Sequence, residues 1–226
     1  MVGPTYCHRQ KIMFVAAADE PGVSVRFAGT ESWSLSIDQW DELLECVLWF
    51  RAAERIEVPV GGSVTGPPDV APVPRPSLAS GEGLVEGWLW WWRSALATSA
   101  GPPDLAELTR LGPPDFDGLA GYPALRDVAS ARWTEAQAWQ SARKRAGIDV
   151  FLAARGRGPG REGAAVAAVE AEIGHKAAPF SARIIVLPVH DRQIRSVGQS
   201  TFLVPERVHV SSAYDDWLRG LVRALA

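Results

Sequence analysis

The chain has 226 residues, of which 47% are hydrophobic and 22% are charged, so it can bury a full core as one large domain or two small ones. Its formal net charge of -3 gives no general attraction to nucleic acid or to anionic membranes, which argues against both as partners. Two cysteines, no signal-peptide pattern and no apolar run of bilayer length predict a cytoplasmic protein. The excess of arginine over lysine is typical of a GC-rich bacterial genome.

Residues 1–60 are predicted to form an N-terminal unit of strands around one helix. We expect a helix that begins at Ser36, because a serine can cap a helix and Gln39 completes a capping box. Alternating or apolar stretches next to turn residues predict the strands. These strands are expected at 11–17, at 23–28, around Trp33 and at 55–60.

Residues 61–83 contain too much proline and glycine for a helix or a central strand, which predicts a linker or a long loop. The rest of the chain, 84–226, begins with a helical section and can form one domain with 1–60. Helices are expected at 84–97, at 104–111 after an Asp104 cap, and at 123–146 with Gly147 at its end.

The last part of the chain returns to mixed structure. Strands are expected at 149–154, 182–189 and 196–204, and a final helix is expected from Ala213 after a Ser212 cap. Strands at both ends of the chain predict a mixed sheet, with a central helical section between them in sequence. The fold class expected from this pattern is α+β.

Gly158, Gly160 and Gly163 form a G-x-G-x-x-G pattern between an expected strand and an expected helix, and Asp191 follows the next strand. This order resembles a dinucleotide cradle. However, Pro159 removes a backbone N–H where donors are needed, and too little chain follows Asp191 for a doubly wound domain. We therefore interpret the glycines as a loop and predict no cofactor, and keep a nucleotide site as the alternative.

Histidines and arginines offer other candidate chemistry. His190, Asp191 and His209 could meet in one pocket and transfer protons, although the segment 190–192 also has the composition of an exposed turn. Their spacing does not indicate a metal site, and no catalytic residue is assigned. A nucleic-acid interface built on three further arginines, Arg155, Arg157 and Arg161, is the weaker hypothesis.

Arg132 and Arg143 are predicted to share one side of the helix at 123–146 with several apolar residues. An arginine on such a side can pair with an acid or stack on an aromatic ring. Of these alternatives, the sequence favours ion pairs inside the protein.

Ten tryptophans are the least ordinary feature of the composition. Helical periodicity assigns most of them to the core, but it places Trp49 beside acidic residues and Trp90 between Glu86 and Arg93. Exposed tryptophans are enriched at interfaces, so Trp49 and Trp90 are predicted interface residues. The alternative is that a second layer of this same chain covers them.

The sequence contains neither a Walker pattern nor a G-x-S-x-G elbow. Together with the expected aromatic surface, this favours an accessory subunit or structural component of a bacterial cytoplasmic assembly, which binds another protein or itself. The alternative is an enzyme for a small molecule or nucleotide, with its site near the glycine-rich loop 156–163 and the turn 190–192.

Overall fold

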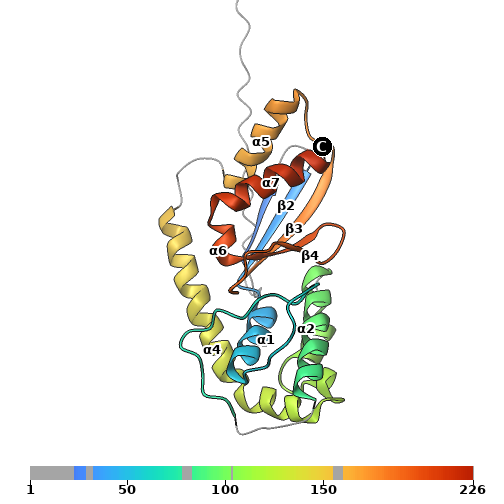
Figure 1. Ribbon diagram of the computed structural model, residues 1–226, viewed down its shortest axis with the longest axis vertical. Coiled ribbons are helices and arrows are strands. Elements are labelled where there is room, and N and C mark those ends of the chain that lie inside the picture. Colours follow the sequence, from blue (N-terminus) through green and yellow to red (C-terminus); the bar gives the residue numbers. More distant parts are fainter. Residues whose placement is uncertain (1–22, 29–32, 78–82, 103, 155–159, 226) are drawn as a thin grey trace, which may run out of the picture.

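The computed structural model describes residues 23–28, 33–77, 83–102, 104–154 and 160–225. Figure 1 shows a sheet in the upper half of the molecule and helices α1, α2 and α4 in the lower half. The elements in chain order are β1 (Val23–Ala28), β2 (Trp33–Gln39), α1 (Glu42–Ala53), α2 (Leu84–Ala100), α3 (Leu105–Leu111), a 3-10 turn (Asp117–Leu119), α4 (Pro123–Ala154), α5 (Arg161–Ile173), β3 (Phe180–Leu187), β4 (Arg195–Ser196), β5 (Thr201–Pro205), α6 (Glu206–His209) and α7 (Ser212–Leu225). The predicted α+β fold is confirmed.

The sheet combines strands from both ends of the chain in the order β1-β2-β3-β5-β4. β2 runs parallel to β3, with Trp33 opposite Phe180, and β3 runs parallel to β5, with Arg183 opposite Thr201. The outer strands β1 and β4 are antiparallel to their neighbours. The carboxyl ends of β2, β3 and β5 therefore lie at one edge of the sheet.

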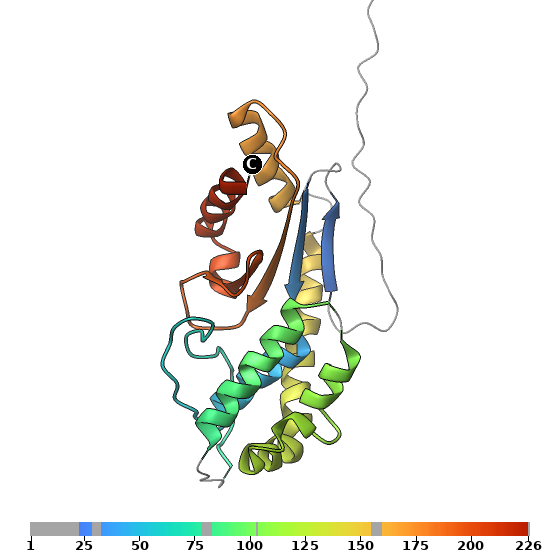
Figure 2. The ribbon, with the colours of Figure 1, turned by 90° about the vertical axis from the view of Figure 1, so that its right-hand side faces the viewer.

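The two faces of the sheet belong to two apolar clusters, because side chains alternate along a strand. Ile184, Val186 and Val204 pack with residues of α5 and α7, which Figure 2 shows together on one side of the sheet. Ile185, Leu187 and Leu203 belong instead to the core of the helical half. β3 is thus buried on both faces, as its continuous apolar run predicts.

The core of the helical half is built around tryptophans of α2. Trp88, Trp91 and Trp92 have no exposed surface. Each indole N–H donates to a backbone carbonyl, of Val47 (2.8 Å), Leu111 (3.0 Å) and Ser63 (2.9 Å) respectively. Because these polar groups are satisfied, the large rings can be buried without an unpaired donor.

The expected start of the first helix is wrong. α1 begins at Glu42, and the Asp41 side chain caps it by accepting a hydrogen bond from the Leu44 N–H at 2.9 Å. Ser36 cannot cap a helix, because it lies in β2, which pairs with a strand on each side. The strand expected at 55–60 is also wrong, because this segment is a loop.

α4 continues through Gly147 to Ala154, so the helix end expected at 147 and the strand expected at 149–154 are both wrong. Glycine is needed at 147 for packing rather than for helix termination, since the Trp40 ring lies against its backbone. The strand expected at 11–17 lies outside the described residues.

The proline-rich loop is attached to the helical core over residues 61–77. The buried Arg51 guanidinium donates to the carbonyls of Thr65 (2.9 Å) and Gly66 (3.0 Å). Val64 and Val70 are buried as well. These contacts fix the path of the loop over the core, while the division of the chain at residues 60 and 83 stays a prediction.

Candidate functional site

A cavity of about 440 Å³ lies where the carboxyl ends of β2 and β3 meet α1, α4 and α6. In sheets with parallel strands, ligands bind at this edge. The cavity walls include Trp40, Glu45, Arg143, Val186, Glu206 and His209, and we call this cavity the Glu45 pocket. Two carboxyl groups, a guanidinium and an imidazole therefore converge on one hollow.

Glu45 has no exposed surface, although it carries an ionisable group. Its nearest cation is Arg143, whose Nη2 and Nε lie 3.4 Å and 3.5 Å from the two carboxyl oxygens. Burial raises the pKa of Glu45 to about 7, because these long contacts with Arg143 only partly offset the loss of hydration. Glu45 therefore exchanges its proton near neutral pH.

Arg143 connects the two carboxyl groups of the pocket. Its Nη2 also lies 3.1 Å from a carboxylate oxygen of Glu206, which is half exposed. The guanidinium carbon lies 5.4 Å from the centre of the Trp139 ring. The sequence prediction of internal ion pairs is confirmed here, and it is confirmed for Arg132, which pairs with Glu54 and Glu135.

His209 brings an uncharged imidazole to the pocket. Burial, reinforced by the positive charge of Arg161, lowers its pKa to about 4. Its Nε2 has no hydrogen-bond partner among the described residues, and the nearest carboxyl oxygen, on Glu162, is 3.9 Å away. A pKa this low makes the imidazole a weak base, so His209 stays neutral at pH 7.

The backbone of Trp40, at the entrance to α1, is strained. Its φ is 63°, in the left-handed region that residues other than glycine seldom adopt. Gln140 donates to the Trp40 carbonyl at 2.9 Å, and the ring packs on Gly147. Such strain persists where surrounding contacts enforce it, and it clusters at functional sites.

The two predicted interface tryptophans lie in different environments. Trp49 is only 2% exposed, because the Arg132 guanidinium covers its ring at 4.9 Å from the ring centre. The expectation that Trp49 is exposed is therefore wrong. Trp90 is half buried, between Tyr122 and Arg110, and its role at an interface stays a prediction.

The glycine pattern does not have the context of a dinucleotide cradle. Gly158 lies outside the described residues, Gly160 directly precedes α5, and Gly163 lies in the first turn of α5. The element before the pattern is the helix α4, whereas a cradle requires a strand there. The expected order of strand, turn and helix is therefore wrong.

Asp191 fixes a turn. Its carboxylate accepts hydrogen bonds from the Gly66 N–H at 3.0 Å and from Arg195 at 2.8 Å. Partial burial opposes ionisation, but these bonds and those from two neighbouring N–H groups lower the pKa of Asp191 to about 2. Asp191 is therefore a permanent anion whose oxygens are engaged by the protein itself.

His190 and His209 contact different partners. His190 lies 3.4 Å from Asp69 and contacts Arg207, whereas His209 lies against Tyr214, with ring centres 4.7 Å apart. Of the three residues expected to share one pocket, His190, Asp191 and His209, only His209 lines the Glu45 pocket.

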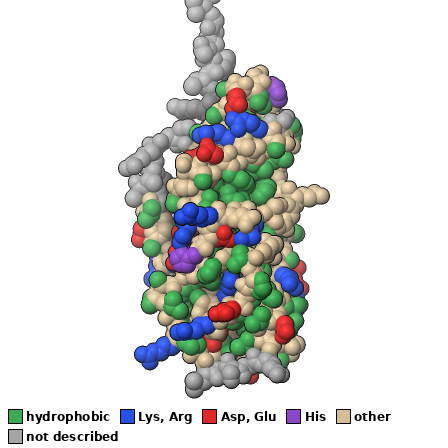
Figure 3. Space-filling view, viewed as in Figure 1, with side chains coloured by type: hydrophobic (Ala, Val, Ile, Leu, Met, Phe, Trp, Pro, Cys, Tyr) green, Lys and Arg blue, Asp and Glu red, His purple; other side chains and the backbone are tan. Residues whose placement is uncertain are grey.

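The hypothesis of a nucleic-acid interface gains no support from the described residues. Arg155 and Arg157 lie outside them, and Arg161 pairs with Asp215. Figure 3 shows acidic and basic side chains mixed over the face drawn, without a continuous basic patch there.

No family model matches the chain, and no similar curated protein or solved structure was found. Within the described residues, no helix is both long and apolar enough to span a membrane. The same residues contain no group of three or more histidine, cysteine or acidic side chains placed to hold a metal ion.

Glu45 is a candidate site residue that sequence reasoning missed. It stands between Leu44 and Cys46 in the apolar stretch of α1, and it is 98 positions from its partner Arg143. The only local signal was a glutamate within a run of residues that the structure buries.

Glu45→Gln is expected to change how stability depends on pH. The raised pKa of about 7 means that the folded protein holds this proton more tightly than the unfolded chain. The resulting contribution to the free energy of unfolding is full below pH 4.5, the usual pKa, and is lost as the pH rises through 7. The lowered pKa of His209 acts in the opposite direction between pH 4 and 6.5, so the two effects oppose each other in the wild type.

The difference in the free energy of unfolding between wild type and Glu45→Gln isolates the contribution of the Glu45 carboxyl group. From about pH 5 to about pH 8, the stability of the wild type relative to the variant should fall by on the order of 3 kcal/mol, measured by urea unfolding. A difference that stays constant over this range would mean that Glu45 has an ordinary pKa.

Proposed function

We propose that the protein is an enzyme that binds a small organic molecule in the Glu45 pocket and transfers protons to and from it. The observation that carries this proposal is the buried carboxyl group of Glu45, which titrates near pH 7 in the wall of a cavity. A general acid or base works best when its pKa lies near the working pH. A group with such a shifted pKa in a cleft also marks a candidate site on physical grounds.

The other groups have complementary roles in this proposal. Arg143 remains positively charged and can stabilise negative charge that develops on the bound molecule. His209 stays uncharged at pH 7, so it adds no second positive charge to the wall of the pocket. Val186 and Val210 give the wall apolar surface against which the carbon skeleton of a bound molecule can pack.

Binding can be tested with a variant that fills the pocket. Ala146 lines the cavity and is exposed, so Ala146→Phe is expected to occupy the space without disturbing the core. Wild-type protein, incubated with a bacterial metabolite extract and washed, should retain a small molecule that mass spectrometry identifies. Ala146→Phe should lose at least nine-tenths of this retention.

Ala142→Phe is the matched control, because Ala142 is exposed one turn earlier on α4 and is not part of the pocket wall. Equal retention by both variants would place the molecule elsewhere. For proton transfer, wild type in D₂O should introduce deuterium into the retained molecule, and Glu45→Gln should not. Exchange at the same rate in Glu45→Gln would remove Glu45 from the chemistry.

The cytoplasmic location is likewise proposed, on the small number of cysteines. An accessory role through binding another protein or a second copy stays a weaker proposal. It is supported by Trp90 alone, since Trp49 is buried.

A further inference from the structure

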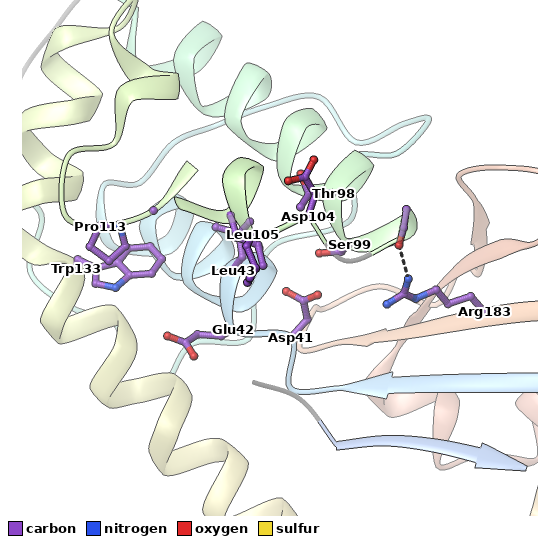
Figure 4. A pocket seen from close by; sticks show the side chains of 13 residues that line it. Asp41, Glu42, Leu43, Thr98, Ser99, Asp104, Leu105, Pro113, Trp133 and Arg183 are labelled. Atoms are coloured by element: carbon purple, nitrogen blue, oxygen red, sulfur yellow. Dashed lines mark hydrogen bonds between the residues drawn. The ribbon is translucent and has the colours of Figure 1, made fainter. Parts of the chain in front are cut away.

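A second cavity, of about 320 Å³, lies on the other side of the connection between β2 and α1. It is bounded by the start of α1, the end of α2, α3 and the β3 residue Arg183. We call it the Asp41 cavity. In Figure 4 Arg183 and Trp133 lie at opposite ends, with Asp41, Leu43 and Leu105 between them.

The charges of this cavity favour a cation. Asp41, Glu42 and Asp104 line it, and Arg183 is the one cationic side chain among its described lining residues. Arg183 is already engaged, since its Nε donates to Asp38 and its Nη1 donates to the Gly101 carbonyl at 3.0 Å. Negative charge therefore exceeds positive charge around the space.

Asp41 has hydrogen bonds but no bound cation among the described residues. Its carboxyl group accepts from the Leu44 N–H at 2.9 Å and interacts with the Ser99 side chain. Burial raises the pKa of this carboxyl group, and the two hydrogen bonds and the positive charge of Arg183 only partly oppose the effect. A cation in the cavity would offset this shift by pairing with the carboxylate.

Trp133 provides an independent observation at the far end. The residue is 8% exposed, and its indole N–H has no hydrogen-bond partner among the described residues. A buried donor without an acceptor is unfavourable, so the Trp133 N–H is the group in this wall that would gain most from a hydrogen-bond acceptor. Between Trp133 and Asp41 the wall carries the apolar side chains of Leu43 and Leu105 together with the carboxyl group of Glu42, and Leu105 at the rim is 79% exposed.

We propose that the Asp41 cavity binds an organic amine with an apolar, aromatic body and an oxygen atom at its far end. The ammonium group pairs with Asp41, the body lies on Leu43 and Leu105, and the oxygen accepts the hydrogen bond from Trp133. A cavity of this volume falls within the range of small-molecule sites. The site is separate from the Glu45 pocket, so it does not depend on the proposed function.

Three probes of nearly equal shape separate the contributions of the ammonium group and the oxygen atom to binding. Tyramine has the ammonium, the ring and the oxygen, phenethylamine lacks the oxygen, and 4-ethylphenol lacks the ammonium. Binding is followed by the indole N–H resonances of the full-length protein, with the Trp133 resonance assigned by its loss in Trp133→Phe. Tyramine should shift this resonance and bind at least tenfold more tightly than 4-ethylphenol, with phenethylamine in between.

A conservative variant tests the position of the charge. Asp41→Asn keeps an oxygen that can cap α1 and removes the negative charge, so tyramine should bind at least tenfold more weakly. Glu86→Gln removes an exposed charge from α2 outside the cavity and should leave tyramine binding unchanged.

Three results would overturn the proposal. The first is equal binding of 4-ethylphenol and tyramine, which needs no variant to interpret. The second is unchanged tyramine binding in Asp41→Asn, and the third is no shift of the Trp133 resonance with tyramine at millimolar concentration.

Discussion

Trp49→Ala is expected to lower the free energy of unfolding by about 3–5 kcal/mol, the loss typical of a large buried aromatic residue. The ring packs edge-on against Phe50, with centres 5.1 Å apart, and the Arg132 guanidinium lies over its face. Removing the ring leaves a cavity and deprives Arg132 of the surface on which it rests. Urea unfolding followed by circular dichroism measures the loss.

Trp90→Ala is the matched control, because Trp90 is half buried on α2. It should lower the free energy of unfolding by about 1–2 kcal/mol, in proportion to its smaller buried area. If Trp49→Ala instead kept its stability and weakened self-association in light scattering, Trp49 would be the interface residue that helical phase predicts.

Gly147→Ala is expected to destabilise the protein by about 3 kcal/mol through a steric clash in a packed region. A Cβ atom at this position would lie 2.2 Å from Cζ2 and 2.5 Å from Cε2 of the Trp40 ring. The ring cannot easily withdraw, because Gln140 holds the Trp40 carbonyl at 2.9 Å. Thermal and urea unfolding of the purified variant measure this effect.

Gly163→Ala is the control for the effect of replacing a glycine within a helix by alanine. A Cβ atom there would have no neighbour within 4 Å, so stability should be unchanged or rise by up to about 1 kcal/mol. A double-mutant cycle adds a second check, since Gly147→Ala should have little effect when Trp40 is already alanine. An equal loss in the Trp40→Ala background would contradict the clash.

The sequence predicted those helices and strands whose buried faces can be read from the spacing of their own apolar residues. The apolar run of β3 indicates burial on both faces, and the spacing of Tyr214, Leu218 and Val222 gives the buried face of α7. The Asp104 cap of α3 was also found, because a cap acts on the next turn of chain.

Contacts between distant segments could not be predicted in this way. Helical phase places Trp49 on the side of α1 that carries Glu42 and Glu45, but it does not reveal that α4 brings Arg132 over that side. For the same reason Arg143 was found as a partner for an acid, while Glu45, the acid itself, was not. Gly147 was misread as a helix end because the bulky ring that requires it belongs to another segment.

The connection from Trp40 to Asp41 forms part of the wall of both cavities, with Trp40 on one side and Asp41 on the other. A molecule that displaces this connection in one cavity therefore changes the shape of the other. Thermodynamic linkage would make such an effect reciprocal, with each occupant altering the affinity for the other by the same factor. Two adjoining residues are thus shared between the walls of the two proposed sites.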